Sequence, residues 1–328
     1  MKSKIAILFT LPLLVLSCQK SNKSLENISE LGYKNSKGSR SDIVKIAIIG
    51  DQGTGERSQR VLKMIRSQKA DLLLINGDFD YENDPIKWRD MNEKILGKDF
   101  PIIAVTGNHD IPNWSEYQKI IKKWQNNSKL NCHGDAGVRT VCNFKGIEIV
   151  SASPGIFEDE PASIDEEFIK KTFNNSRSKW RICQWHKNMH DMQTGLKGDE
   201  TGWGVYEECR ENGAMIVTGH EHAYARSYLL SSIKDKEVSS YSDLMELKKG
   251  KSVVVLSGLG GISSRALRHD GYWWADKENL DTGVKAGALF CSYDLNKDLT
   301  TCYFLDEWGD IKDLFYIKNL ILNKKNQL

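Results

Sequence analysis

The fold is decided by three short apolar runs that each end in a polar residue after glycine: VKIAIIGD at residues 44–51, DLLLINGD at 71–78 and PIIAVTGN at 101–108. The segments between them, ERSQRVLKMIRSQK at 56–69 and the stretch through Trp88 and Leu96, carry apolar residues at helical spacing. Strands that alternate with helices predict βαβ units and a parallel sheet.

The second half of the chain is richer in predicted strands. Apolar runs occur at 147–153 (IEIVSAS), 180–186 (WRICQWH), 214–220 (AMIVTGH) and 252–258 (SVVVLSG), and a closing hairpin is expected around Asn296. Strands therefore come to outnumber helices, which indicates a layered α/β architecture with two sheets. Composition shows no break after residue 43, so we expect one domain over 43–328.

The first residues have the pattern of a secretion signal, a basic start followed by an apolar run at 5–18 that is too short for an ordinary membrane span. Residues 15–18, Val-Leu-Ser-Cys, resemble a bacterial lipobox, which predicts an acylated Cys18 at the mature N-terminus. The alternative is a cleaved signal with an accidental cysteine. Residues 19–42 are predicted to be a flexible tether. We expect a secreted, membrane-anchored lipoprotein facing the periplasm or the cell exterior.

The overall composition is that of a soluble globular protein. The chain has 328 residues, of which 40% are hydrophobic and 27% charged, and a formal net charge of +2. Dense runs of Lys and Arg interleaved with aromatic residues are missing from the sequence, so a nucleic-acid partner is not expected.

The sequence has seven cysteines, and six remain if Cys18 is acylated. An even number in an oxidising compartment favours disulfides, and the lack of a CxxC pair argues against a cysteine zinc site. A two-residue turn at 296–297 would place Cys291 opposite Cys302 on neighbouring strands. Cys132 and Cys142 could close a similar loop, which leaves Cys183 and Cys209 as a pair only by elimination.

Several predicted strands end in side chains that can bind a metal ion. The carboxyl ends of strands in α/β sheets meet in one crevice, so residues distant in sequence can lie together there. Taken alone, an Asp after Gly is usually a turn or a helix cap, and a lone HxH is a weak signal. The joint occurrence at five strand ends predicts a metal site. The residues concerned are Asp51, Asp78, Tyr81, Asn108, His186, His220 and His222.

The order Asp, GDxxY, GNHD, His, GHxH over residues 50–222 resembles the motif signature of the calcineurin-like metallophosphoesterases. The resemblance implies a sandwich of two β-sheets flanked by helices, with two metal ions at the strand ends. It implies one metal held by Asp51, Asp78, Tyr81 and His222. It implies the other held by Asp78, Asn108, His186 and His220, with Asp78 as the bridge.

Two positions resemble the purple-acid-phosphatase branch in particular. Gly53 stands where most of the superfamily has His, and Tyr81 supplies a phenol three residues after Asp78. This exchange implies a ferric ion beside a second ion of Zn, Mn or Fe. The alternative is that Tyr81 is a buried aromatic that only donates a hydrogen bond near the site.

Other segments match the branch less evenly. Residues 257–261, Ser-Gly-Leu-Gly-Gly, resemble a turn that these enzymes place beside the site. Asn188 stands where the family usually has Pro, and Ala225 stands where it commonly has Glu. Substrate preference does not transfer from the resemblance, because the loops that set it are the parts that differ.

The resemblance implies hydrolysis of a small phosphorylated substrate, with phosphomonoesters expected and diesters or nucleotides as the alternative. The metals would activate hydroxide for in-line attack on phosphorus. His109 is the candidate general acid, although it could instead only orient a carboxylate. Asn108 and His190 are candidate substrate-binding residues, and Asp110 is expected to be a partner of His109 or a turn residue.

The sequence argues against two other function classes, a P-loop or dinucleotide-binding protein and a non-catalytic binding protein. The segment IAIIGDQGTGER has the strand, glycine loop and helix order of a nucleotide-binding turn, but it lacks the Lys-Ser/Thr of a P-loop and its glycines do not match GxGxxG. A non-catalytic surface-binding lipoprotein on the same fold would typically have lost metal ligands, yet all seven candidate ligands are present here.

Overall fold

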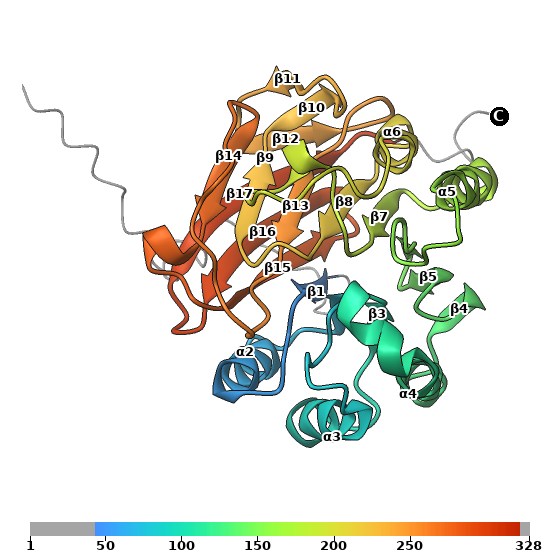
Figure 1. Ribbon diagram of the computed structural model, residues 1–328. Helices are drawn as coiled ribbons and strands as arrows, with labels where there is room; N and C mark the ends of the chain where they lie inside the picture. The colour runs from blue at the N-terminus through green and yellow to red at the C-terminus, as the bar shows by residue number, and fades with distance from the viewer. Residues whose placement is uncertain (1–42, 322–328) are drawn as a thin grey trace, which may run out of the picture. The chain divides into compact units, whose positions relative to one another are not determined.

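The computed structural model describes residues 43–321, which form two large β-sheets with helices on their outer faces (Figure 1). This is the predicted metallophosphoesterase-type sandwich. Cys18 and the proposed tether at 19–42 lie outside the described residues. Among residues 43–321, no helix combines the length and the apolar character that a membrane crossing requires.

The seven-stranded sheet has the strand order β12-β17-β16-β15-β1-β2-β3. Strands β1, β2 and β3 are parallel, as the alternation of strands and helices predicts, and β15, β16 and β17 continue the sheet as antiparallel neighbours. The strands are β1 Ile43–Ile49, β2 Leu72–Asn76, β3 Ile102–Val105, β12 Leu244–Leu247, β15 Gly287–Asp294, β16 Leu299–Asp306 and β17 Ile311–Asn319.

The eight-stranded sheet has the order β14-β9-β13-β8-β7-β6-β5-β4. Like the first sheet, it combines parallel strands with antiparallel neighbours. Strands β6, β7, β8 and β13 are parallel, whereas β4, β5, β9 and β14 pair antiparallel at the two sides. The strands are β4 Asn131–Asp135, β5 Arg139–Phe144, β6 Ile147–Ser151, β7 Trp180–Gln184, β8 Met215–Thr218, β9 Tyr224–Ser227, β13 Val254–Ser257 and β14 Trp274–Glu278. A separate hairpin joins β10 Leu229–Ser232 to β11 Glu237–Ser240.

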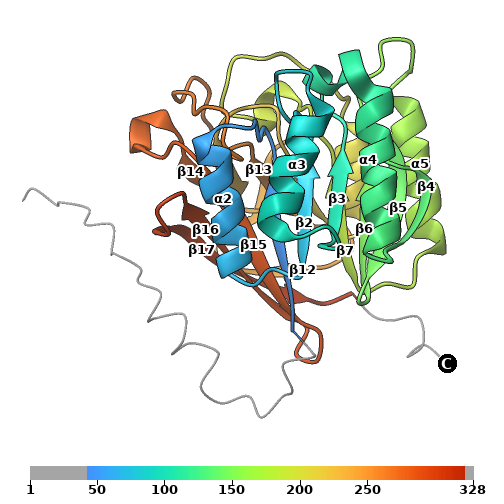
Figure 2. The same ribbon diagram turned by 90° about the horizontal axis from the view of Figure 1, so that it is seen from below.

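Helices cover the outer face of each sheet. Figure 2 shows α2 Glu56–Ser67, α3 Pro85–Leu96 and α4 Trp114–Asn127 side by side across the seven-stranded sheet. Helices α5 Ser163–Asn175 and α6 Gly204–Glu211 pack together on the eight-stranded sheet. Short 3₁₀ helices lie at η3 Asn108–Asn113, η4 His190–Met192 and η5 Leu280–Thr282. Helix α3 begins at Pro85, and Asp84 caps it by accepting a hydrogen bond from the Lys87 backbone N–H.

The main core lies between the two sheets. Alternate residues of each strand face it, for example Ile46 and Ile48 of β1 on one side and Ile182 of β7 on the other, all fully buried. A further core fills the space under α5 and α6 and includes Trp185 and Tyr206, whose rings meet edge to face. Burial of apolar surface on both sides of the eight-stranded sheet explains why its central strands read as continuous apolar runs.

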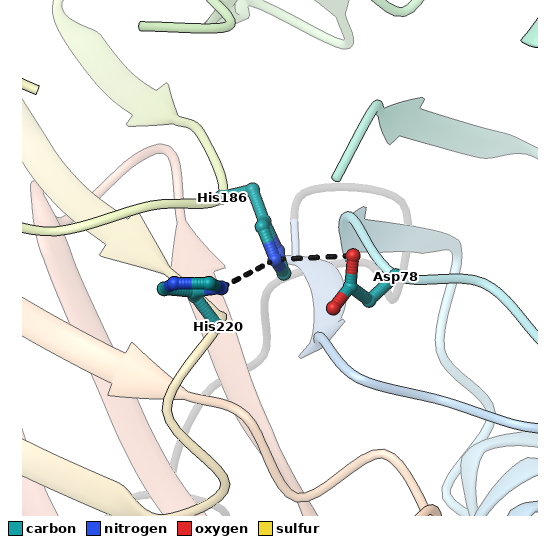
Figure 3. A group of neighbouring side chains, drawn as sticks. All are labelled: Asp78, His186 and His220. Carbon is teal, nitrogen blue, oxygen red and sulfur yellow. Dashed lines mark hydrogen bonds and ion pairs between the residues drawn. The ribbon is translucent and has the colours of Figure 1, made fainter. Parts of the chain in front are cut away.

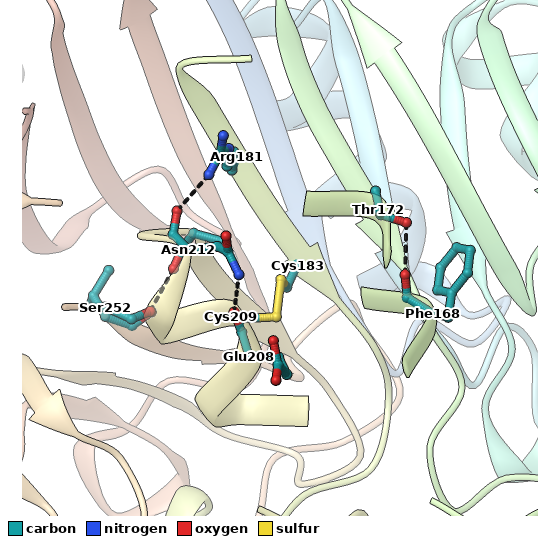
Figure 4. The surroundings of a disulfide bond; sticks show 10 residues. Phe168, Thr172, Arg181, Cys183, Glu208, Cys209, Asn212 and Ser252 are labelled. Atoms are coloured by element: carbon teal, nitrogen blue, oxygen red, sulfur yellow. Dashed lines mark hydrogen bonds between the residues drawn. A yellow bond between two sulfur atoms is a disulfide. The ribbon is translucent and has the colours of Figure 1, made fainter. Parts of the chain in front are cut away.

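Three disulfides pair the six cysteines as expected. Cys291 lies opposite Cys302 in the register of β15 and β16, and Cys132 lies opposite Cys142 in that of β4 and β5. The expected hairpin register holds, although the strands end earlier and leave a four-residue connection at 295–298. The third disulfide joins Cys183 of β7 to Cys209 of α6 (Figure 4), which fastens a covering helix to the sheet that it covers.

Candidate metal centre

The parallel strands of both sheets end at the same place, and their end loops carry the predicted ligands. In one cluster, the Nε2 of His186 lies 3.2 Å from the Oδ1 of Asp78 and 3.1 Å from the Nδ1 of His220 (Figure 3). The three residues form a group whose ligand atoms all lie within 4.8 Å of one another, and all three are buried. Asn108 adds a buried Oδ1 that has no hydrogen-bond partner. A buried carbonyl oxygen without a donor is what a cation at this point would satisfy.

Both imidazoles of this cluster are oriented through their other nitrogen. The Nδ1 of His186 lies 2.7 Å from the backbone oxygen of Asn76, and the Nε2 of His220 lies 2.9 Å from the Oε2 of Glu200. A ring N–H that donates to an oxygen leaves the opposite nitrogen with its lone pair free for a metal ion. Sequence reasoning missed Glu200, because its loop gives no periodic or motif signal.

A second cluster is formed by Asp51, Tyr81 and His222. The Tyr81 hydroxyl donates to Oδ1 of Asp51 over 2.8 Å and lies 3.0 Å from Nε2 of His222. That imidazole nitrogen is also 3.5 Å from the same Asp51 oxygen. The Nδ1 of His222 lies 2.6 Å from the Ser263 hydroxyl, which orients the ring. Carboxylate, phenol and imidazole thus converge here, and this set suits a hard cation.

The backbone at the site is strained. Asp51, Asp78, Tyr81 and His220 all have positive φ, at 56°, 54°, 62° and 73°. Such conformations cost about 1–3 kcal/mol each for residues with a Cβ and persist where the surroundings impose them. The concentration of strain on four candidate ligands supports a functional reason for the geometry.

Glycines and Asp110 hold the strained loops in place. A Cβ at Gly107 would come within 2.2 Å of Oδ1 of Asp78, and one at Gly258 would come within 2.8 Å of Oδ2 of Asp51. Gly258 belongs to the glycine turn at 257–261, which therefore does lie beside the site. The Asp110 carboxylate accepts the backbone N–H groups of Asp78, Phe79 and Gly107, which fixes the two loops that carry Asp78 and Asn108. Asp110 thus acts as a turn residue.

Burial prepares two of the three histidines, His220 and His222, as neutral ligands. Burial lowers the pKa of His220 to about 4, and burial together with the Arg265 charge lowers the pKa of His222 to about 3. Burial alone would also lower the pKa of His186, but the neighbouring carboxylate of Asp78 raises it to about 9. A cation that enters here displaces the proton shared by that pair.

Burial and neighbouring charges also shift the pKa values of the candidate oxygen ligands, in directions that differ from one residue to the next. Burial raises the pKa of Asp51 to about 7, against the opposing charge of His186. Burial opposes the ionisation of Asp78 as well, but the charge and hydrogen bond of His186 hold its pKa below the usual range. Burial and the carboxylates of Asp51 and Asp78 raise the pKa of Tyr81 well above its ordinary value. The phenol of Tyr81 is therefore expected to keep its proton unless a bound cation displaces it.

His109 and His190 lie in different surroundings. The backbone N–H of His109 donates to Oδ1 of Asp78 over 2.9 Å, while its exposed ring lies 4.6 Å from that of Tyr81. His109 therefore lies on the solvent side of the ligands, where a substrate would arrive. His190 lies against His269, with ring centroids 4.2 Å apart, and its Nδ1 is 2.8 Å from the backbone oxygen of Lys197. Its role in binding substrate stays a prediction.

Two departures from the family pattern have local explanations. Asn188 donates to the backbone oxygen of Gly219 and accepts from the Tyr206 hydroxyl, so it links the His186 loop to the His220 loop. Gly53 adopts a φ of 70°, which glycine accommodates readily. The HxH spacing at 220–222 predicts two rings on the same face of a strand, and this prediction is wrong: the segment is a bend after β8, so the two rings enter different clusters.

A family model for the calcineurin-like phosphoesterases matches residues 44–224, which include all five motifs. The chain therefore belongs to the calcineurin-like phosphoesterase family. Membership and the relatives described next imply a dinuclear metal centre, and the two clusters fit it.

Similar proteins include purple acid phosphatases. Probable purple acid phosphatase 20 of Arabidopsis thaliana is 21% identical over 206 residues, covering 56% of this chain and 46% of that protein. The chain thus spans about half the length of this curated relative. The structure of purple acid phosphatase PPD1 from yellow lupin (Lupinus luteus) seeds has a TM-score of 0.63 and 16% identity, over 84% of this chain and 54% of that one.

A third similar protein is not described as a phosphatase. GAP50, the anchor in the inner membrane complex of Plasmodium, matches with a TM-score of 0.60 and 10% identity, over 84% of this chain and 89% of that one. At these identities the structural comparisons show the shared fold.

Proposed function

We propose that this protein is a binuclear metallohydrolase that cleaves phosphate esters, with phosphomonoesters as its substrates. The observation that carries the proposal is the convergence of two ligand clusters from both sheets, with the orphaned Oδ1 of Asn108 beside Asp78 and His186. Asp78 interacts with both clusters, because its Oδ1 lies 3.2 Å from Nε2 of His186 and its carboxylate helps to raise the pKa of Tyr81.

Bound metal ions would supply Lewis acidity, an activated water at neutral pH and charge stabilisation for the transferred phosphoryl group. The protein's own contribution is orientation. Glu200, Ser263 and the Asn76 carbonyl fix the three imidazoles, and Asp110 fixes the loops that present Asp78 and Asn108. A site positioned this tightly needs little reorganisation as charge develops in the transition state.

His109 is proposed as the general acid for the leaving alkoxide. Its backbone is held by Asp78 while its side chain remains exposed at the mouth of the site. An exposed imidazole can exchange its proton with solvent between turnovers and reach a leaving oxygen.

The cluster of Asp51, Tyr81 and His222 is proposed to hold ferric iron, because the phenol oxygen of Tyr81 is a hard donor that suits this ion. Charge transfer from the phenolate to iron should then colour the protein, and Tyr81→Phe should bleach it. The measurement is a visible spectrum together with iron content. An iron-loaded native protein without a visible band would reject ligation by Tyr81 while leaving the other six candidate ligands in place.

The activity test uses the purified domain loaded in turn with Fe, Zn and Mn. We expect turnover of 4-nitrophenyl phosphate to exceed turnover of bis(4-nitrophenyl) phosphate. A preference for the diester would replace the monoesterase proposal by the phosphodiesterase alternative. No turnover of either ester by protein that contains two metal ions per chain would contradict the proposed function.

A non-catalytic anchoring role is the second candidate, and the comparison that favours it is the structural likeness to GAP50, the anchor in the inner membrane complex of Plasmodium. The candidate ligands that converge in this chain argue for catalysis instead. Metal-free protein that folds normally and shows no uptake of Fe, Zn or Mn would favour the anchoring role.

We further propose that the chain is a secreted lipoprotein held at a membrane through Cys18, on the strength of the lipobox-like residues 15–18. Cys18→Ala should then release the protein from the detergent phase in a phase-partition experiment. Identical partitioning of both forms would exclude the lipid anchor.

A further inference from the structure

A pocket of about 530 Å³ opens beside the metal centre, and its lining is rich in basic side chains. Its lining includes Leu196, Lys197, Glu221, Arg265, Arg268 and Leu280. We call these six residues the cationic pocket. Three of its side chains are basic and one is acidic, so its lining has a clear positive excess.

The cationic pocket is continuous with the ligands. The Nη2 of Arg265 lies 3.2 Å from Nε2 of His222, the nitrogen that faces Asp51 and Tyr81, and the backbone N–H of Arg265 donates to the His222 carbonyl. Lys197 donates to the backbone oxygen of His220. Two basic side chains from two different loops therefore touch the segment that supplies a ligand to each cluster.

The acidic residue of the pocket is already engaged. Glu221 has Oε2 at 3.0 Å from Nη1 of Arg265 and 3.9 Å from Nζ of Lys197. Across residues 43–321 no hydrogen bond or ion pair is recorded for the Arg268 guanidinium, which is exposed at the pocket. One carboxylate shared by two cations, with a third cation free, leaves capacity for a further anion.

The rim of the cationic pocket is apolar. Leu196 and Leu280 are 72% and 47% exposed, so two large aliphatic side chains flank the basic ones. Backbone hydrogen bonds from Arg268 and His269 to the Thr194 carbonyl, and from Leu280 to the Arg265 carbonyl, hold these segments together. The pocket is thus built from three loops tied to one another.

We propose that the cationic pocket binds a second anionic group of the substrate, a phosphate or a carboxylate, while the ester phosphate of the same molecule lies at the metal centre. The preferred substrates would then be phosphate esters with two anionic ends joined by a partly apolar spacer. This inference rests on the proposed function and adds the substrate class to it.

The test uses matched substrates that differ only in the distal end. Hexane-1,6-diol bisphosphate is compared with hexane-1,6-diol monophosphate and with 6-phosphonooxyhexanoate, which has a carboxylate at that end. Phosphate release by the metal-loaded enzyme gives kcat and KM for each. Because the bisphosphate has two equivalent ester groups, statistics alone give it a twofold advantage. We expect at least about a tenfold advantage in kcat/KM, the lower range for a charge-assisted hydrogen bond, carried mainly by KM.

Arg268→Gln is the decisive variant, because its side chain makes no recorded contact with the candidate ligands. It should bring the bisphosphate advantage down to about the statistical factor while leaving kcat/KM for the monophosphate within about twofold. The matched control is Lys63→Gln, which removes one positive charge from a different basic groove on α2 and α3. That control should retain the full advantage.

The outcomes separate the two proposals. A native enzyme that hydrolyses all three esters at rates within the statistical factor would overturn the cationic-pocket inference and leave the phosphatase proposal standing. An equal loss in Arg268→Gln and Lys63→Gln would also overturn it, since the effect would then be general attraction by net charge. No hydrolysis of any ester would contradict the proposed function itself. The carboxylate substrate decides which anion is preferred: an advantage for it alone assigns the pocket to a carboxylate.

Discussion

The two sheets contribute different chemistry to one site. Loops after β1, β2 and β3 of the seven-stranded sheet supply the oxygen ligands Asp51, Asp78, Tyr81 and Asn108, whereas loops after β7 and β8 of the eight-stranded sheet supply the three imidazoles. Each proposed metal therefore has ligands from both sheets. Neither sheet alone therefore forms a metal site, and the two sheets must keep their relative positions for the protein to be active.

The two sheets also differ in which ligands have a strained backbone and in which contacts hold the ligands in position. Three of the four strained ligands, Asp51, Asp78 and Tyr81, follow strands of the seven-stranded sheet, where Asp110 and the glycines hold them. On the other side, His186 and His220 are oriented by hydrogen bonds to Asn76 and Glu200. The backbone loops of one half are fixed by the Asp110 carboxylate and by glycines, and the imidazoles of the other half are fixed through their ring nitrogens, so we expect the two halves to fail differently.

The largest expected effect comes from Asp78→Asn, because this change removes the carboxylate that both metals are proposed to share. Activity should fall to background, and both metals should be lost or strongly weakened. His220→Ala, on the eight-stranded sheet, should abolish activity but remove only the metal proposed to lie between Asp78, His186 and His220. Metal analysis by mass spectrometry distinguishes the two variants. Full metal content and activity in both would refute the ligand assignment.

The next effect concerns His109, which follows the seven-stranded sheet but is not a proposed ligand. His109→Ala should lower kcat by about 10² to 10⁴ while metal content stays near that of the native protein. Steady-state kinetics on 4-nitrophenyl phosphate, with metal analysis of the same sample, checks this. A parallel loss of metal and activity would make His109 a structural residue.

Glu200→Gln tests whether the hydrogen bond between Glu200 and His220 tunes the binding of the metal ion. The amide keeps the size of the side chain but weakens the hydrogen bond to Nε2 of His220, so metal affinity should drop by about 10- to 100-fold. Competition with a chelator measures the affinity. Glu166→Gln on α5 is a matched control distant in sequence, and it should leave the affinity unchanged. An unchanged affinity in Glu200→Gln would show that the contact does not tune the metal.

Much of this arrangement could be predicted from the sequence, because local signals mark it. Apolar runs that end in Gly-Asp, Gly-Asn-His or Gly-His locate the strand ends, and parallel strands bring such ends together. The disulfide between Cys291 and Cys302 was predictable from hairpin register, since the spacing places the two residues opposite one another.

What could not be predicted depends on the paths of long loops. Glu200 reaches His220 and Arg265 reaches His222 only because loops without apolar periodicity return to the site. The bend at 220–222 also escaped prediction, because the positive φ of His220 is imposed by the surrounding packing and no sequence pattern encodes it.

The smallest effects on activity are expected from the disulfides, because each large sheet has one in an antiparallel pair away from the ligands. Replacing Cys291 and Cys302 by Ala should lower the free energy of unfolding by about 2–3 kcal/mol, and the Cys132 and Cys142 pair should have a similar effect, since the two loops are nearly equal in length. Denaturant unfolding measures the change, with kcat as the control. A large loss of kcat in the folded variants would mean that these antiparallel strand pairs control the site.

The most direct test of the central claim is a crystal structure of the metal-loaded protein with anomalous scattering measured at the metal absorption edges. The account predicts two anomalous peaks between the sheets, with the Asp78 carboxylate bound to both. Asp51, Tyr81 and His222 should surround one peak, and Asn108, His186 and His220 the other. A single peak, or two peaks that do not share Asp78, would contradict the account.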